Sequence, residues 1–322
     1  MSVAVSGKAK ADEALRCPRE SFGTRWKKSY NTNKYIYWML VPIILYYLLF
    51  HYMPMAGSVI AFQNYKPAKG FWGSEWVGFA NFVEFLTGPY AWRLIRNTLL
   101  LNVYQIIFGF PAPIILALMI NEVRHKKYKK LVQTVSYMPH FISLVVICGM
   151  LVTFSRTDGL FNDILVMFGG ERINLLAESS LFRTIFTGSG IWQSVGWGSI
   201  IYLATLSNVD PSLHEAAAID GAGRIRRIFH ISLPALVPVI VVQFIMRIGN
   251  ILTQGFEKII LLYNPLTYET ADVISSYVYR RGIIDMDFSF GAAVGIFNSI
   301  VNLTILVLAN NFFRKTTKES LW

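Results

Sequence analysis

The sequence predicts an all-α integral membrane protein with six transmembrane helices. Of its 322 residues, 54% are hydrophobic and only 15% are charged, whereas soluble domains carry about 25% charged residues. The apolar residues also form long runs without Asp, Glu, Lys or Arg, and about 20 such residues span a bilayer. Because lipid offers the backbone no hydrogen-bonding partner, runs of this length are predicted to be helices.

Six runs are long enough to be spans. In chain order they are 35–65, 97–121, 131–155, 184–209, 228–246 (continuing past Arg247 to residue 256) and 288–313. A further run, 259–268, is too short to cross a bilayer. Because proline removes a helical hydrogen bond, kinks are predicted inside the spans at Pro42, Pro54, Pro111, Pro113 and Pro139. The first run follows a polar segment, so we expect it to be retained and not cleaved as a signal peptide.

The distribution of charge predicts the orientation. The segments 1–34, 122–130, 208–232 and 313–322 together hold 19 basic and 8 acidic residues, and the three remaining loops hold 8 basic and 11 acidic ones. Excess Lys and Arg stay on the cytoplasmic side of a membrane. We therefore expect a cytoplasmic basic tail 1–34, a six-span domain 35–313 and a cytoplasmic C-terminal tail 314–322. The net charge of +11 then reflects topology, and no nucleic-acid partner is expected.

No motif for chemistry accompanies the spans. The two cysteines, Cys17 and Cys148, fall in different environments, so neither a disulfide nor a metal site is expected. The sequence contains no G-x-x-x-x-G-K-[ST] phosphate loop, no H-E-x-x-H and no convincing pair of nucleophile and base. We expect no catalytic residue, no metal ion and no cofactor bound by this chain, so energy for any transport must come from elsewhere.

The loop 208–232 between spans four and five has its own local structure. Asp210 followed by Pro211 is typical of a helix start, and "SLHEAAAI" continues the helix. Asp220-Gly221 should end it, because glycine tolerates the left-handed conformation of helix ends. The basic stretch "RIRRIFHISLP" then leads into span five. From these residues alone, a solvated connector and a slim helix that enters a groove on another protein both remain open.

This loop resembles the signature loop of membrane subunits of ATP-binding-cassette importers. The matching residues are Glu215-Ala216-Ala217, Asp220-Gly221-Ala222 and Ile231-x-Leu233-Pro234. Four further segments are similar to carbohydrate-uptake permeases of the oligosaccharide and polysaccharide branch: "GFANFVEFL", "YMPHFIS", "GFEKIILLYNP" and "ADVISSYVYRRG".

The resemblance implies a permease subunit with a cytoplasmic coupling helix between spans four and five. It implies three kinds of protein partner in a bacterial cytoplasmic membrane: a second homologous permease, two ATPase subunits that bind ATP and Mg, and an extracytoplasmic solute-binding protein. Closure of the ATPase pair would push the loop and switch the permease between inward-open and outward-open states. The residues expected to couple are Glu215, Ala216, Ala217, Asp220, Gly221 and Ala222.

Polar residues inside the spans suggest a substrate path. Gln243, Arg247, Asn250 and Gln254 are spaced by four, three and four, which places them on one helical face. An arginine at a helix centre costs about 2.5–3.5 kcal/mol on insertion scales, so this face should meet protein or a water-filled cavity. Other candidates are Asn298 and Asn302 in span six, Asn102 and Gln105 in span two, and Trp192 and Trp197 in span four.

Amides, an arginine and flat aromatic rings suit a hydroxyl-rich ligand, and the fixed charge favours an acidic sugar. The alternatives are interhelical hydrogen bonding for the amides, worth about 0.6 kcal/mol per contact, and interfacial anchoring for the tryptophans. His51, His140 and His230 are expected to be structural.

Three other functions fit the sequence less well. A permease for a non-sugar solute would use the same coupling loop, but the segments before span six favour sugars. A self-contained secondary transporter predicts internal repeats and gives no reason for the loop. A membrane-embedded enzyme would need a catalytic cluster, which the sequence does not show.

Overall fold

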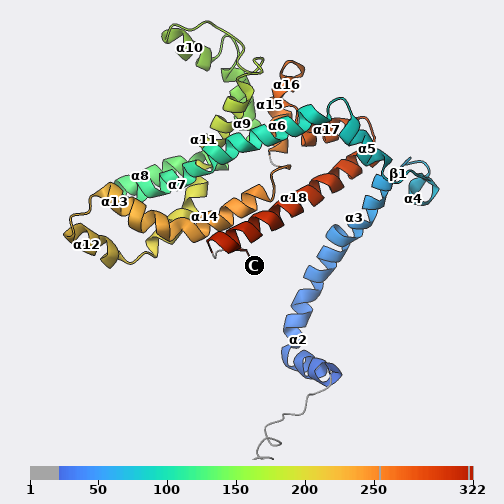
Figure 1. Cartoon of the computed structure of the whole chain (residues 1–322), viewed down its shortest axis with the longest axis horizontal. Helices are drawn as coiled ribbons and strands as arrows, with labels where there is room; N and C mark the ends of the chain where they lie inside the picture. Colours follow the sequence, from blue (N-terminus) through green and yellow to red (C-terminus); the bar gives the residue numbers. More distant parts are fainter. Residues whose placement is uncertain (1–21, 254, 318–319, 322) are drawn as a thin grey trace, which may run out of the picture. The chain divides into compact units, whose positions relative to one another are not determined.

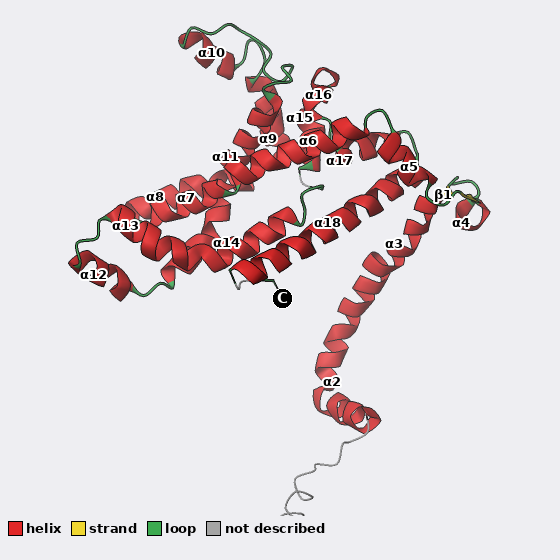
Figure 2. Cartoon of the chain, viewed as in Figure 1, coloured by secondary structure: helices red, strands yellow, loops and turns green. Residues whose placement is uncertain are grey.

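The structure is a computed structural model, and it describes residues 22–253, 255–317 and 320–321. Figures 1 and 2 show that helices dominate. Among the described residues, one antiparallel pair of short strands, β1 (Gln63–Asn64) and β2 (Glu75–Trp76), places Gln63 opposite Trp76. The chain divides into two compact units, Met1–Val59 and Ile60–Trp322.

The first unit is built from one long helical stretch. It contains α2 (Phe22–Tyr47), a π-helical turn η1 (Leu48–Tyr52) and α3 (Met53–Ala56). Asn33, with φ −117° and ψ 24°, leaves helical geometry and kinks α2. Residues 22–34 of the predicted basic tail are therefore helical, and residues 1–21 of that tail lie outside the described residues.

The second unit begins with a 3₁₀ turn, the strand pair and a long helix. Its first elements are η2 (Gly57–Phe62, which joins the units), α4 (Gly70–Gly73), α5 (Ala80–Thr87), α6 (Ala91–Tyr104), η3 (Gln105–Gly109), α7 (Pro111–Asn121), α8 (Lys126–Tyr137), η4 (Met138–Phe141), α9 (Leu144–Phe154), α10 (Leu160–Met167) and α11 (Phe182–Ser207). Of these, α6, the π-helical η3 and α7 form one continuous 31-residue helical stretch, Ala91–Asn121.

The remaining elements run from the predicted cytoplasmic loop to the C-terminus. They are α12 (Pro211–Ile219), α13 (Arg224–Arg227), η5 (Ile228–Ser232), α14 (Leu233–Ile248), α15 (Phe256–Leu262), η6 (Pro265–Thr267), α16 (Tyr268–Ala271), α17 (Ile274–Val278), η7 (Tyr279–Ile284) and α18 (Phe288–Thr316). In Figure 1, α12 and α13 lie at one end of the second unit and α5 and α17 at the other, and α18 runs from the α17 end toward the α12 end.

Four helical stretches among the described residues are long and apolar enough to cross a membrane. They are Tyr30–Phe62, Ala91–Asn121, Arg224–Ile248 and Phe288–Thr316. A fifth candidate is the pair Lys126–Phe141 and Leu144–Phe154, which bends by 93°. The bend follows Pro139 in η4, so the kink predicted at Pro139 is confirmed. The predicted fourth span forms α11, which has 26 residues but is less apolar than the others because it is rich in glycine, serine and threonine.

Span five is shorter than predicted. The expected continuation to residue 256 is wrong, since α14 ends at Ile248 and residues 249–253 form turns. Gly249 caps the helix and packs so tightly on α18 that a Cβ there would lie 2.6 Å from Leu306 Cδ1. The amide of Leu252 then donates to Asn302 Oδ1 at 3.2 Å. Contacts with α18 therefore hold the chain in a turn where the apolar pattern alone would continue a helix.

The glycines of α11 bring it unusually close to its neighbours. A Cβ on Gly196 would lie 2.0 Å from the carbonyl oxygen of Ser136, and one on Gly198 would lie 3.0 Å from Pro113 Cγ. Small residues permit this close approach of helices in membranes. As a result α11 packs along both α7 and α8, which forms one wall of the site described below.

A buried ionic cluster fixes the segment before α18 to α6. Asp272 is fully buried and accepts two hydrogen bonds from Arg280, at 2.9 and 2.7 Å. Arg93 of α6 lies 3.4 Å from the same carboxylate, and Ser276 Oγ donates to it at 2.7 Å. Burial alone would lower the pKa of Arg280, but the hydrogen bonds of Asp272 and Tyr263 outweigh it and raise that pKa.

Candidate functional site

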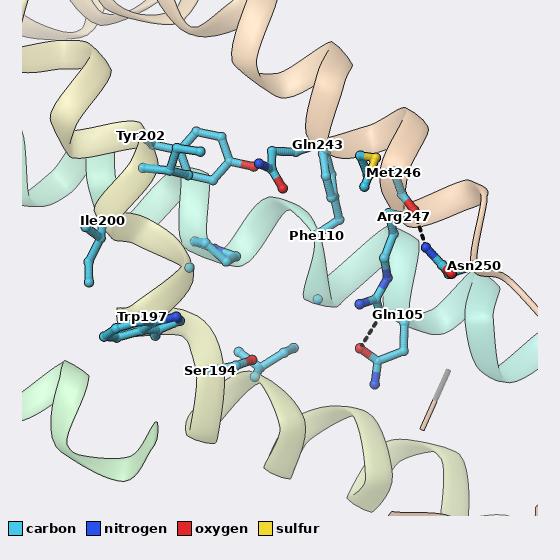
Figure 3. Close-up of a pocket in the computed structure, with 15 residues that line it drawn as sticks. Gln105, Phe110, Ser194, Trp197, Ile200, Tyr202, Gln243, Met246, Arg247 and Asn250 are labelled. Carbon is cyan, nitrogen blue, oxygen red and sulfur yellow. Dashed lines mark hydrogen bonds between the residues drawn. The ribbon is translucent and has the colours of Figure 1, made fainter. Parts of the chain in front are cut away.

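A cavity of about 820 Å³ lies among η3, α7, α11 and α14 (Figure 3). Its volume falls within the range of roughly 300–1,000 Å³ that is typical of ligand sites. The polar part of its lining comes from Gln105, Ser194, Tyr202, Gln243, Arg247 and Asn250. None of the described residues that line it is Asp or Glu.

Three of the four residues of the predicted stripe on span five line this cavity. Gln243 and Arg247 lie one turn apart on α14. Asn250 lies beyond the end of the helix, where its side-chain amide donates to the carbonyl of Met246 at 3.0 Å. Gln254 lies outside the described residues. The prediction of one continuous helical face is therefore wrong after Ile248, although the turn still brings Asn250 to the cavity.

Arg247 extends across the cavity toward span two. Its Nη2 donates to Gln105 Oε1 at 3.2 Å (Figure 3). Gln105 opens the π-helical turn η3, a feature that is frequent at functional sites. Gly109 leaves room for the Gln105 side chain, because a Cβ at Gly109 would lie 2.8 Å from Gln105 Oε1. Among the described residues, no carboxylate lies within ion-pair distance of Arg247.

A smaller cavity of about 190 Å³ adjoins the first. The two share Gln105, Ser194 and Arg247, and the smaller one adds Asn102, Gln193 and Lys258 to its polar lining. Lys258 of α15 is only 7% exposed, and its Nζ donates to the carbonyl of Phe186 at 2.8 Å. Lys258 and Gln193 were not among the site residues predicted from the sequence. The sequence feature that could have identified Lys258 is its position directly before the apolar run 259–268, which follows span five.

The two predicted tryptophans lie in different places. Trp197 lines the larger cavity and stacks on His140, with ring centroids 4.6 Å apart and planes inclined by 4°. Trp192 lines a separate cavity of about 430 Å³, whose other lining residues include Ile147, Leu151 and Phe161. The structure thus brings Trp197, and not Trp192, to the polar cavity.

The asparagines of span six lie away from both polar cavities. Asn298 is buried, and its Oδ1 has no hydrogen-bond partner among the described residues. Asn302 accepts the hydrogen bond from Leu252 that holds the turn after α14. In span two, Gln105 lines both polar cavities and Asn102 lines the smaller.

The predicted cytoplasmic loop folds as the sequence indicated. Asp210 caps α12 by accepting a hydrogen bond from the amide of Ser212 at 2.9 Å, and this backbone hydrogen bond lowers the pKa of Asp210. Gly221 has φ +77°. The amide of Ala222 bonds the carbonyl of Ala217 at 2.8 Å, and that of Gly221 bonds Ala218 at 3.1 Å, which together form a Schellman cap. The helix, sharp turn and second helix are therefore confirmed.

Helix α12 lies on the surface of the second unit. None of its residues is buried, and of the six predicted coupling residues Glu215, Ala216, Asp220 and Gly221 are exposed while Ala217 and Ala222 are half-buried. Large apolar side chains lie beside them, with Ile219 87% and Ile225 72% exposed. Exposed apolar side chains of this size leave the segment accessible to a partner.

Comparisons with known proteins agree with the motifs. Residues 95–318 match the family described as binding-protein-dependent transport system inner membrane component. Protein LplB of Bacillus subtilis (strain 168) is 42% identical over 301 residues, 93% of this chain and 95% of LplB. The polygalacturonan/rhamnogalacturonan transport system permease protein YteP of the same organism is 45% identical over 291 residues, 90% of this chain and 91% of YteP.

A solved structure is similar over nearly the whole chain. A chain of a bacterial alginate ABC transporter, in complex with an alginate pentasaccharide-bound periplasmic protein, matches with a TM-score of 0.85 and 44% identity. The match covers 91% of this chain and 99% of that one. The predicted resemblance to carbohydrate-import permeases is thereby confirmed. This chain belongs to the family of binding-protein-dependent transport system inner membrane components and is a non-enzymatic permease subunit of a sugar or oligosaccharide ABC importer.

Proposed function

We propose that this subunit supplies half of the path by which an acidic oligosaccharide crosses a bacterial cytoplasmic membrane, and that the 820 Å³ cavity belongs to that path. The observation that carries the proposal is Arg247, a cation that lines the cavity without a carboxylate partner among the described residues. A cation away from bulk water is costly unless it is paired. A sugar carboxylate would supply the missing charge, and the amides of Gln105, Gln243 and Asn250 suit sugar hydroxyls.

The substrates named for similar proteins support the same class. YteP is named for polygalacturonan and rhamnogalacturonan, and the similar structure is of an alginate transporter. Galacturonan and alginate are polymers of uronic acids, so each sugar unit carries a carboxylate. Neither of these two proteins is named for a non-sugar solute.

Six spans with both termini in the cytoplasm fit this role. At 1.5 Å per residue, α11 is roughly 39 Å long, which exceeds the roughly 30 Å of a bilayer core. Of its polar residues, Gln193 and Ser194 line cavities and Ser199 is buried. The bent pair of α8 with η4 and α9 serves as the third span. Segments 1–34 and 314–322 are then cytoplasmic tails, on the side to which the excess of Lys and Arg assigns them.

The coupling segment connects this subunit to the other components of the importer. Helix α12 docks into an ATPase subunit, with Glu215, Ala216 and Ala217 at the contact and Asp220, Gly221 and Ala222 forming the turn. ATP and Mg bind to two such ATPases and not to this chain. A second homologous permease closes the other side of the path, and an extracytoplasmic solute-binding protein delivers the sugar.

Uptake by the reconstituted importer tests the substrate class. The complete complex in vesicles, with ATP inside and binding protein outside, is offered a galacturonate tetramer, an alginate tetramer and a neutral galactose tetramer. We expect ATP-dependent uptake of at least one of the two acidic oligomers and little of the neutral one. Uptake of the neutral oligomer alone would contradict the proposal.

A further inference from the structure

The smaller cavity adjoins the proposed path at the break in span five. It shares Gln105, Ser194 and Arg247 with the larger cavity, so the same three side chains border both cavities. Its volume of about 190 Å³ is below the range of roughly 300–1,000 Å³ typical of complete ligand sites. It therefore has the dimensions of a side pocket for one part of a larger ligand.

Two cations line this side pocket. Arg247 is in the last turn of α14, and Lys258 is in the first turn of α15, so they flank the turn that interrupts the helix. Both line the pocket, and none of its described lining residues is Asp or Glu. An anion bound in the pocket would therefore have two cations and no carboxylate of the described lining beside it.

Both cations retain donors for a ligand. A lysine ammonium has three N–H donors and an arginine guanidinium has five. Among the described residues, Lys258 Nζ donates to the carbonyl of Phe186, and Arg247 Nη2 donates to Gln105. The other donors of the two groups are left for a ligand, and a carboxylate accepts hydrogen bonds at both of its oxygens.

Gly190 of α11 opens the space between these donors. A Cβ at this position would lie 3.3 Å from Lys258 Nζ and 3.5 Å from Gln105 Nε2. Any side chain here would therefore occupy the region that both nitrogen atoms face. Glycine has a lower helix propensity than alanine. Its presence at position 190 therefore does not favour the helix, but it leaves space beside the Lys258 ammonium.

We propose that Lys258, Arg247 and Gln105, with Gly190 as the floor, form a subsite that binds one uronate carboxylate of the transported oligosaccharide. This inference rests on the proposed function, because it assigns part of the acidic specificity to residues of the same path. Lys258 is then a specificity-determining residue, in addition to its hydrogen bond with Phe186.

The test uses the complete importer in vesicles and two matched probes, a galacturonate tetramer and the same tetramer as its methyl ester. The ester keeps the size and hydroxyls and removes the charge. We compare wild type with Lys258→Met, Lys258→Arg and Gly190→Ala, using one preparation of binding protein. Any preference of the binding protein then cancels when the acid-to-ester uptake ratios are compared. ATP hydrolysis stimulated by loaded binding protein reports that each variant assembles.

We expect Lys258→Met to lower the acid-to-ester uptake ratio about tenfold, the size of one lost hydrogen bond to a charged group. Lys258→Arg should retain most of the ratio. Gly190→Ala should lower it too, although the Phe186 contact stays in place and alanine favours the helix. Stimulated ATP hydrolysis should persist in all three.

An unchanged ratio in both Lys258→Met and Gly190→Ala, with wild type importing the acidic tetramer, would overturn the subsite and leave the proposed function standing. Wild type that imports the methyl ester but no acidic oligomer would overturn the proposed function itself.

Discussion

Two clusters of buried or half-buried cations lie in the second unit, and they differ in what surrounds them. In the cluster around Asp272, Arg280 and Arg93 bond one fully buried carboxylate. In the cavity, Arg247 and Lys258 bond an amide oxygen and a backbone carbonyl, and no carboxylate of the described lining faces them. In the first cluster a carboxylate of the protein pairs with both arginines, whereas in the second no carboxylate of the described lining offsets the two positive charges.

The difference separates a structural cluster from a binding site. A buried ion pair is strongly destabilised when one partner is removed, because the other charge stays behind without compensation. The Asp272 cluster should therefore respond to mutation as part of the fold. A cation that faces a cavity already lacks a carboxylate partner in the empty protein. Its removal should therefore weaken ligand binding more than it lowers the stability of the fold.

The largest effect on stability is expected for Asp272→Asn. The change leaves Arg280 and Arg93 without their carboxylate, which should cost about 3–5 kcal/mol of unfolding free energy. Thermal unfolding of the purified complex measures the loss. The matched control is Glu269→Gln, since the pair of Glu269 with Arg96 is exposed and such pairs contribute about 0–1 kcal/mol. Equal losses for the two variants would show that burial does not set the strength of the Asp272 cluster.

The coupling segment contains neither cluster, so a change there should affect transport without disturbing them. Gly221→Val forces a β-branched residue to φ +77°, which should cost about 1–2 kcal/mol locally. We expect ATP hydrolysis to lose most of its stimulation by loaded binding protein, while the unfolding temperature of the permease changes little. The control is Gly223→Val, because Gly223 has φ −64° and no heavy atom within 4 Å of a built Cβ. Normal stimulation in Gly221→Val would remove the coupling role from this turn.

The smallest effect on stability, and the sharpest contrast with Asp272, is expected for Arg247→Gln. Removing an unpaired charge relieves an insertion cost of about 2.5–3.5 kcal/mol, so the complex should assemble at least as well as wild type. Uptake of an acidic oligosaccharide should fall about tenfold, since a hydrogen bond to a charged group is lost. The control is Met246→Leu, which changes another lining residue at nearly constant volume. It should alter neither the assembly of the complex nor the uptake of the acidic oligosaccharide. Collapse of the complex in Arg247→Gln would show that Arg247 has a structural role like that of the residues around Asp272.

Local and periodic features were accessible from the sequence by itself. Length and apolarity determined the second and sixth spans and the core of the first and fifth, because an uninterrupted apolar run in lipid has no alternative to a helix. Asp210, Pro211 and Gly221 determined the bounds of α12, since capping involves residues only a few positions apart. The family followed from the motifs around this loop, and the comparisons confirmed it.

Only the tertiary structure decided which polar residues meet. Gln105 and Arg247 are 142 positions apart, and no periodicity relates residues on different helices. The end of α14 at Ile248 depends on the packing of Gly249 against Leu306 and on the hydrogen bond from Leu252 to Asn302, which hydropathy cannot register. Lys258, counted with a loop because its apolar run is short, becomes a residue of the site because the turn at 249–253 brings α15 back against α11. A sequence records each side chain's chemistry, whereas the charge balance of a site depends on which side chains packing brings within reach of one another.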